Sequence, residues 1–179
     1  MLAVLRNPTL LAVSIGHTAV DMFTSALPIL LVVFAVRLGL SNVEIGTIVT
    51  FYTLAGSLAQ PFFGLIADRW ASHWFGISAV LWQAGGFVLA TMLPGRAAFV
   101  AFVLAALGSG AYHPHGSLNI RRASGANAAT ATSVFFFFGL AGHALGPVLA
   151  GFLLARTDLP WTAIGMASLV GPVALLLLR

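Results

Sequence analysis

Long uncharged apolar runs are the feature that most constrains this chain. The runs are about 20 to 33 residues long, and a helix needs about 20 residues to cross the hydrocarbon core of a bilayer. Charged residues make up only 7% of the 179 residues, whereas soluble domains carry about 25%. The mean hydropathy is +1.03. The sequence therefore predicts an all-α integral membrane protein.

The runs predict six transmembrane helices joined by short loops. Their expected bounds are 8–36, 45–68, 73–94, 97–121, 125–155 and 160–178. Because the loops are short, consecutive helices are expected to be antiparallel neighbours in one bundle. Residues 1–179 are interpreted as a single six-helix transmembrane domain. No soluble domain is expected, so the function has to lie within the membrane part.

The basic residues predict the topology. All eight are arginines, and they lie near the ends of the predicted spans. An even number of spans places both termini on one side of the membrane. If that side is the cytoplasm, the inside arginines are Arg6, Arg69, Arg121, Arg122 and Arg179, and the outside ones are Arg37, Arg96 and Arg156. This excess follows the positive-inside rule.

Composition also indicates the location and excludes some partners. Arginine without lysine, together with abundant alanine and glycine, is typical of a GC-rich bacterial genome, so we expect a multi-pass protein of the bacterial inner membrane. The net charge is +4, but scattered arginines do not form the continuous patch that follows a phosphate backbone, and no nucleic-acid partner is expected. The absence of cysteine excludes disulfides and thiolate metal sites.

One charge lies where a charge is costly. Asp21 falls within the run from Pro8 to Val36, and a helix built from that run places it roughly 20 Å from either end. A carboxylate at the centre of a bilayer costs on the order of 3 kcal/mol, so such a residue faces a protein interior and usually has a function. His17 precedes it by one helical turn on the same face. We predict that Asp21 and His17 couple protons or bind substrate.

Three more histidines fall within predicted spans, His113 and His115 in the fourth and His143 in the fifth. Imidazole titrates in the physiological range, so these residues are further candidates for proton coupling or substrate binding. His115 is two residues from His113 and shares its helix face only if Pro114 distorts the turn. The alternative is that these histidines bond to backbone carbonyls freed at kinks.

Two motifs carry a family resemblance. The second span ends in Gly64-x-x-x-Asp68-Arg69, which resembles the signature that the major facilitator superfamily of secondary transporters carries between its second and third spans. The fifth span resembles that superfamily's antiporter motif, a Gly-Pro pair with flanking small residues. Its residues here are Gly142, Gly146, Pro147 and Gly151.

A narrower resemblance is to the fosmidomycin-resistance branch of drug exporters. It rests on Gly16, His17 and Asp21 in the first span and on the stretch from Tyr112 to Gly116 in the fourth. The resemblance covers the whole chain but only the amino-terminal half of such a transporter. These transporters ordinarily have twelve spans in two parallel halves, whereas six are predicted here.

The resemblance implies where the site lies. In this architecture the first and fourth spans line the cavity, so His17, Asp21 and His113 are expected to converge there. His143 is expected to approach from the fifth span, and His115 is kept as a further candidate. Other polar residues that are candidates to line the same cavity are Thr50, Thr53, Gln60 and Asn119.

The resemblance also implies a partner. The two halves of these transporters are parallel repeats about an axis along the membrane normal, with the site between them. A C2 homodimer with the same axis reproduces that arrangement. We expect spans two and five to pack against spans five and two of the partner. Asp68 is then expected near the positive N-terminus of the partner's fifth helix.

These expectations combine into a proton-coupled exporter of small molecules that works by alternating access as a homodimer in the lipid bilayer. No cofactor and no metal are expected, because the proton gradient supplies the energy. One alternative is a subunit or fragment that needs a different six-span partner. A passive channel is a second alternative. An intramembrane enzyme with a metal on His17 and Asp21 is disfavoured, because the sequence shows no further acidic or thiolate ligand set.

Overall fold

The computed structural model describes residues 6–69 and 72–178, and within them every regular element is helical. The elements are α2 (Pro8–Leu38), α3 (Asn42–Arg69), α4 (His73–Met92), α5 (Ala97–Ser124), η1 (Gly125–Asn127), α6 (Ala128–Leu154), α7 (Leu159–Ser168) and α8 (Val170–Leu177). Five stretches of the described chain are long and apolar enough to cross a membrane: Pro8–Leu38, Asn42–Arg69, His73–Met92, Ala97–Leu154 and Leu159–Leu177.

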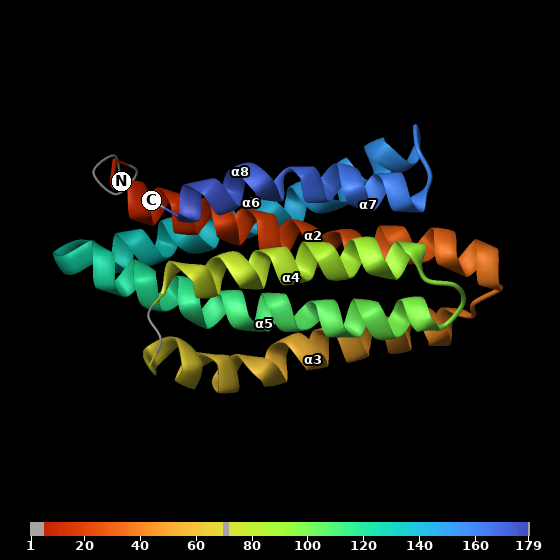
Figure 1. Ribbon diagram of the computed structural model, residues 1–179, viewed down its shortest axis with the longest axis horizontal. Coiled ribbons are helices and arrows are strands. Elements are labelled where there is room, and N and C mark those ends of the chain that lie inside the picture. The colour runs from red at the N-terminus through yellow and green to blue at the C-terminus, as the bar shows by residue number, and fades with distance from the viewer. Residues whose placement is uncertain (1–5, 70–71, 179) are drawn as a thin grey trace.

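Two of these stretches are interrupted helices. Ala97–Leu154 has 58 residues, far more than the about 20 that one crossing needs. It contains α5 and α6, and the chain reverses between them at the 3₁₀ turn η1, so that α6 runs back alongside the bundle (Figure 1). The last stretch is divided at Leu169 into α7 and α8, which follow one another across the same side of the bundle. The described residues thus cross the bundle six times.

Local sequence signals set the ends of α2. The side-chain oxygen of Asn7 accepts hydrogen bonds from the backbone N–H groups of Thr9 (3.0 Å) and Leu10 (3.2 Å), which caps the free donors of the first turn. Pro8 fits the first helical position because it has no N–H to satisfy. The helix ends at Gly39, whose φ of 64° is the left-handed conformation that glycine adopts without strain.

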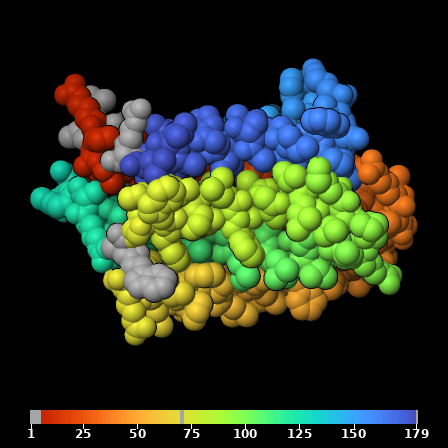
Figure 2. Space-filling view, in the orientation of Figure 1, coloured from red at the N-terminus to blue at the C-terminus, as the bar shows by residue number. Residues whose placement is uncertain are grey.

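α2 lies at the centre of the bundle and α3 at its edge. α2 packs against α4, α5, α6 and α8, whereas α3 packs mainly on α5 (Figure 1). In the space-filling view, most of α2 is hidden between α4 and the C-terminal helices (Figure 2). The buried residues of α3 are few: Ile48, Tyr52, Gly56 and Ala67. α3 therefore exposes most of its surface.

Glycines bring α6 into close contact with α2. A Cβ added to Gly142 would meet the backbone of Thr18 at 3.0 Å or less, and one added to Gly146 would meet the backbone of Met22. Gly151 has no neighbour within 4 Å of such an atom. The antiporter-like motif is thus divided, because its first two glycines pack on α2 and the third faces away from the bundle.

The described chain begins and ends at the same end of the bundle (Figure 1). α3 and α5 end there and α4 and α6 begin there, whereas the loops that follow α2, α4 and α6 lie at the opposite end. Arg6, Arg69, Arg121 and Arg122 fall at the first end, and Arg37, Arg96 and Arg156 at the second. Arg179 lies outside the described residues. The arginines separate as the sequence predicted, and the cytoplasmic assignment stays a prediction.

The close packing of α2 and α6 predicts unequal effects of the same substitution on one helix. Gly142→Ala inserts a methyl group against the backbone of Thr18, and such overpacking costs about 1–3 kcal/mol. Gly151→Ala places its methyl in open space, and we expect a change of no more than about 1 kcal/mol, in the stabilising direction. Thermal unfolding of both purified variants in detergent measures the difference. Equal stabilities would show that Gly142 does not hold α6 on α2.

Candidate functional site

Three imidazoles surround the carboxylate of Asp21. Asp21 is 4% exposed in the middle of α2. Its Oδ2 lies 3.1 Å from Nε2 of His17 and 3.2 Å from Nδ1 of His143, and its Oδ1 lies 3.2 Å from Nε2 of His113. These side chains come from α2, α5 and α6. The structure thus brings together four of the five residues predicted to act in proton coupling or substrate binding, which we call the Asp21 cluster.

Backbone carbonyls fix which nitrogen of two rings faces the carboxylate. Nδ1 of His17 lies 2.8 Å from the carbonyl oxygen of Phe135, and Nδ1 of His113 lies 2.8 Å from that of Ser109. A carbonyl oxygen can only accept, so both Nδ1 atoms carry a hydrogen and donate it. In both residues Nε2 is therefore the atom directed at Asp21.

This arrangement has a consequence for the charge of the cluster. In a neutral imidazole that donates through Nδ1, Nε2 presents a lone pair. A lone pair and a carboxylate oxygen about 3 Å apart repel each other, so each Nε2···O contact requires a proton or another cation between the two atoms. The cluster therefore binds protons or other cations around one buried carboxylate.

α6 approaches this site closely because of one glycine and one phenylalanine. The ring of His17 stacks on that of Phe135 with centroids 4.0 Å apart. A Cβ at Gly139 would lie 2.7 Å from Oδ2 of Asp21, so a larger residue there would displace the carboxylate. Phe135 also supplies the carbonyl that orients His17, a role with no side-chain signal in the sequence.

A polar network from α4 forms the wall beside the cluster. The buried Gln83 donates through Nε2 to the hydroxyl of Tyr52 (3.0 Å), to Oγ1 of Thr24 (3.1 Å) and to the carbonyl of Val20 (3.1 Å). Sequence reasoning missed these residues. Gln83 could have been found as a polar amide in the middle of an apolar span, where polar groups are costly unless they are paired.

A cavity of about 190 Å³ reaches the cluster. Asp21, His113 and His143 line it on one side, and α3 lines it on the other, with Thr53 and Gln60 among its residues. These two predicted lining residues therefore lie at the cavity. Thr50, also predicted to line it, is exposed one turn away, and its hydroxyl donates to the carbonyl of Gly46 (2.8 Å).

His115 and Asn119 do not face the Asp21 cluster, contrary to expectation. Pro114 lies within the continuous helix α5, so positions 113 and 115 keep the separation of about 200° that two helical residues have. The buried His115 accepts a hydrogen bond from the side-chain amide of Asn119 (3.1 Å). Both residues line a different hollow, which they share with His73.

The loop motif lies near the end of the bundle. Gly64 and Asp68 line a hollow of about 290 Å³ together with Pro114 and Arg121 of α5 and Thr132 of α6. Asp68 and Arg69 are exposed. The motif thus adjoins the N-terminal part of α6 within this chain, and the predicted contact with the α6 of a partner stays a prediction.

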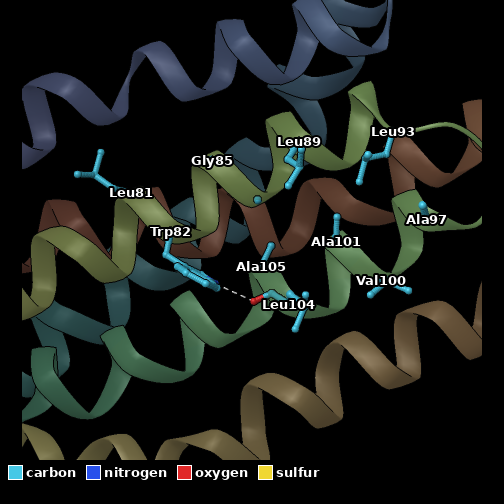
Figure 3. A pocket seen from close by; sticks show the side chains of 11 residues that line it. Leu81, Trp82, Gly85, Leu89, Leu93, Ala97, Val100, Ala101, Leu104 and Ala105 are labelled. Atoms are coloured by element: carbon cyan, nitrogen blue, oxygen red, sulfur yellow. Dashed lines mark hydrogen bonds between the residues drawn. The ribbon is translucent and has the colours of Figure 1, made fainter.

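A larger groove is apolar and lies away from the cluster, between α4 and α5 (Figure 3). Its volume is about 600 Å³, and it is lined by leucines, alanines, glycines, Val100 and Trp82. The indole N–H of Trp82 donates to the carbonyl of Leu104 (2.8 Å), which satisfies the one polar group of that side chain. This lining suits hydrocarbon chains and carries no titratable group. The Asp21 cluster is therefore the candidate functional site.

Comparison with known proteins agrees with this architecture. The sequence pattern of the Major Facilitator Superfamily matches residues 9–179. The Fosmidomycin resistance protein of Escherichia coli (strain K12) is 31% identical over 145 residues, which are 80% of this chain and 36% of that relative. The chain thus spans little more than a third of the relative's length. This multi-pass membrane protein belongs to the Major Facilitator Superfamily of secondary transporters, and its crossings form a half of that superfamily's all-α fold.

Proposed function

We propose that this protein is a proton-coupled exporter of small molecules that works by alternating access. The observation that carries the proposal is the contact of three imidazoles with one buried carboxylate beside a cavity. The other three acids, Glu44, Asp68 and Asp158, lie near helix ends, so Asp21 is the one carboxylate of the sequence in the middle of a span. In this proposal the protein lies in the bacterial inner membrane, and both of its termini are cytoplasmic.

Coupling follows from competition for one site. The contacts of Asp21 with Nε2 of His17 and Nε2 of His113 each require a proton or a cation, so a substrate that binds the same groups displaces protons. When the cavity then opens to the other side of the membrane, protons displace the substrate. A cationic drug binds the carboxylate, and an anionic drug binds the imidazolium groups. The energy comes from the proton gradient and needs no cofactor.

The name of the E. coli relative supports a drug as the substrate, because that protein is named for resistance to fosmidomycin. Removal of a drug from the cytoplasm is one way in which a membrane transporter produces resistance. We therefore take fosmidomycin as the first compound to test, together with cationic drugs.

A homodimer completes the cavity in this proposal. Thr50, Thr53, Ser57 and Gln60 follow each other at spacings of three and four along α3, so they share one helix face. Three of them are exposed and Gln60 is half-buried. A stripe of hydroxyl and amide groups is a poor surface for lipid, so it is better covered by protein or by a water-filled cavity. The ring of His143 is also half-exposed beside it.

A second copy related by a two-fold axis along the membrane normal covers both surfaces. In that dimer, α3 and α6 of one protomer face α6 and α3 of the other, and two Asp21 clusters face one cavity. Asp68 then lies near the N-terminus of the partner's α6. The second candidate is a unit that works with a different six-span partner, which would cover the same polar stripe of α3.

The proposed coupling predicts the effect of neutralising Asp21. Asp21→Asn removes the carboxylate and keeps the size of the side chain. We expect the rate of coupled proton movement to fall at least about a hundredfold, because a positioned proton-transfer group contributes about that much to a rate. The measurement uses purified protein in liposomes that contain a pH-sensitive dye, with fosmidomycin or a cationic drug added outside.

The matched control is Asp158→Asn. Asp158 caps α7 through a bond from the backbone N–H of Trp161 (3.2 Å), and asparagine caps a helix equally well. We expect native activity from it. Coupled proton movement that survives in Asp21→Asn would overturn the role of Asp21 and leave the protein a transporter.

The dimer predicts a specific cross-link. The chain has no cysteine, so a pair introduced at Ser57 of α3 and Ala144 of α6 reports on these positions alone. Both residues are exposed near the middle of their helices. We expect a short bifunctional maleimide to yield covalent dimers of the pair in membranes. In the control pair, Ser57 is combined with Leu89 on the outer face of α4, and we expect monomers. Equal dimer yields from the two pairs would argue against this interface.

A further inference from the structure

We propose that His17, Asp21 and His113 bind one divalent ion of a late first-row transition metal, with Zn²⁺ as the typical occupant. The inference goes beyond proton-coupled drug export, because it names a ligand class that neither the sequence motifs nor the relatives indicate. It concerns binding at equilibrium, so it is tested without any transport assay. It therefore stands or falls separately from the proposed function.

The donor atoms are close enough to share one ion. His17, Asp21 and His113 each offer one ligand atom, and these three atoms lie within 4.8 Å of one another. Nδ1 of His143 lies 3.2 Å from Oδ2 of Asp21 and 3.3 Å from the carbonyl oxygen of Gly139, so it donates a hydrogen bond and is not counted as a ligand. Zinc bonds of about 2.0–2.1 Å in a tetrahedron place ligand atoms about 3.3 Å apart, so side-chain shifts of about 1 Å bring the three protein ligands onto one ion and leave the fourth position open to the cavity.

The outer partners of the rings are those of metal-binding histidines. A histidine that binds a metal through one nitrogen commonly donates its other N–H to a backbone carbonyl or a carboxylate, which fixes the free nitrogen toward the ion. His17 does this with Phe135, and His113 does it with Ser109. Both Nε2 atoms are thus presented as bare donors to the same point. A cation at that point removes the repulsion between these lone pairs and the oxygens of Asp21.

The donor set selects the kind of metal. Imidazole nitrogens suit Zn²⁺, Cu²⁺ and Ni²⁺, whereas Mg²⁺ and Ca²⁺ require shells made of oxygen atoms. Here two imidazoles accompany one carboxylate, and the sequence has no cysteine to bias the site toward a thiolate metal. We therefore expect Zn²⁺ or Co²⁺ to bind and Mg²⁺ not to bind.

An ion also has a path to the site. The cavity of about 190 Å³ borders Asp21, His113 and His143, and His17 closes the cluster on the buried side. The side chain of His143 is 49% exposed and therefore stands at the entrance. An ion that enters the cavity meets His143 first and His17 last.

The test is titration of the purified protein, after removal of any affinity tag and of bound metal by a chelator, with Zn²⁺ in a calorimeter and with Co²⁺ in a spectrophotometer. We expect one ion per chain, with the strong visible absorption of four-coordinate Co²⁺. His113→Ala and Asp21→Asn are expected to weaken binding at least about tenfold, the lower end of what even an outer-shell change costs. Mg²⁺ is expected to give no signal.

His115→Ala is the matched control, because His115 is a buried histidine of the same helix that accepts a bond from Asn119 and lies away from the cluster. It is expected to bind Zn²⁺ like the native protein. Thermal unfolding and gel filtration of each variant establish that it is folded. The proposal is overturned if the folded native protein binds no Zn²⁺ or Co²⁺, if His113→Ala keeps native affinity, or if His115→Ala loses affinity as much as His113→Ala does.

Discussion

The contact between the Asp21 carboxylate and its imidazoles is the interaction on which the rest of the structure depends. A carboxylate at this depth is costly in a membrane protein unless nearby groups compensate its charge, and the compensating groups come from three helices. α6 reaches the carboxylate because Gly139 leaves room for it, and Gly142 continues the close approach to α2. The small residues of α6 therefore allow the close approach that the polar residues of α2 need for their charge to be compensated.

Much of the fold was predictable from the sequence, because apolar run length and charge position are local properties. The pairing of His17 with Asp21 was equally local, since it needs only helical spacing. His113 and His143 became candidates because their imidazoles fall within predicted spans, and their rotation about α5 and α6 decides whether they reach Asp21. That rotation could not be read from the sequence. It placed His113 at the cluster and turned His115 toward Asn119 instead.

Other parts of the site had little signal in the sequence for physical reasons. The carbonyl of Phe135 orients His17, yet every residue has a carbonyl, so only the close packing of α6 on α2 gives this one a role. Gln83 stood out as a polar residue in an apolar span, but its partners on α2 and α3 depend on how three helices pack. Sequence reasoning thus found the charged centre and missed the groups that hold it in place.

The cluster lies between two pairs of closely packed helices. α2 and α6 are joined through glycines, and so are α3 and α5, because a Cβ at Gly110 would lie 2.6 Å from the carbonyl oxygen of Gly56. The cavity at Asp21 lies between these two pairs, with Thr53 and Gln60 on the α3 side. Asp21 and its imidazoles thus border the cavity from α2, α5 and α6, and the polar side chains of α3 form the opposite wall. In transporters built from two parallel halves the site lies between the halves, and a polar cavity bordered by four helices of one half fits that position.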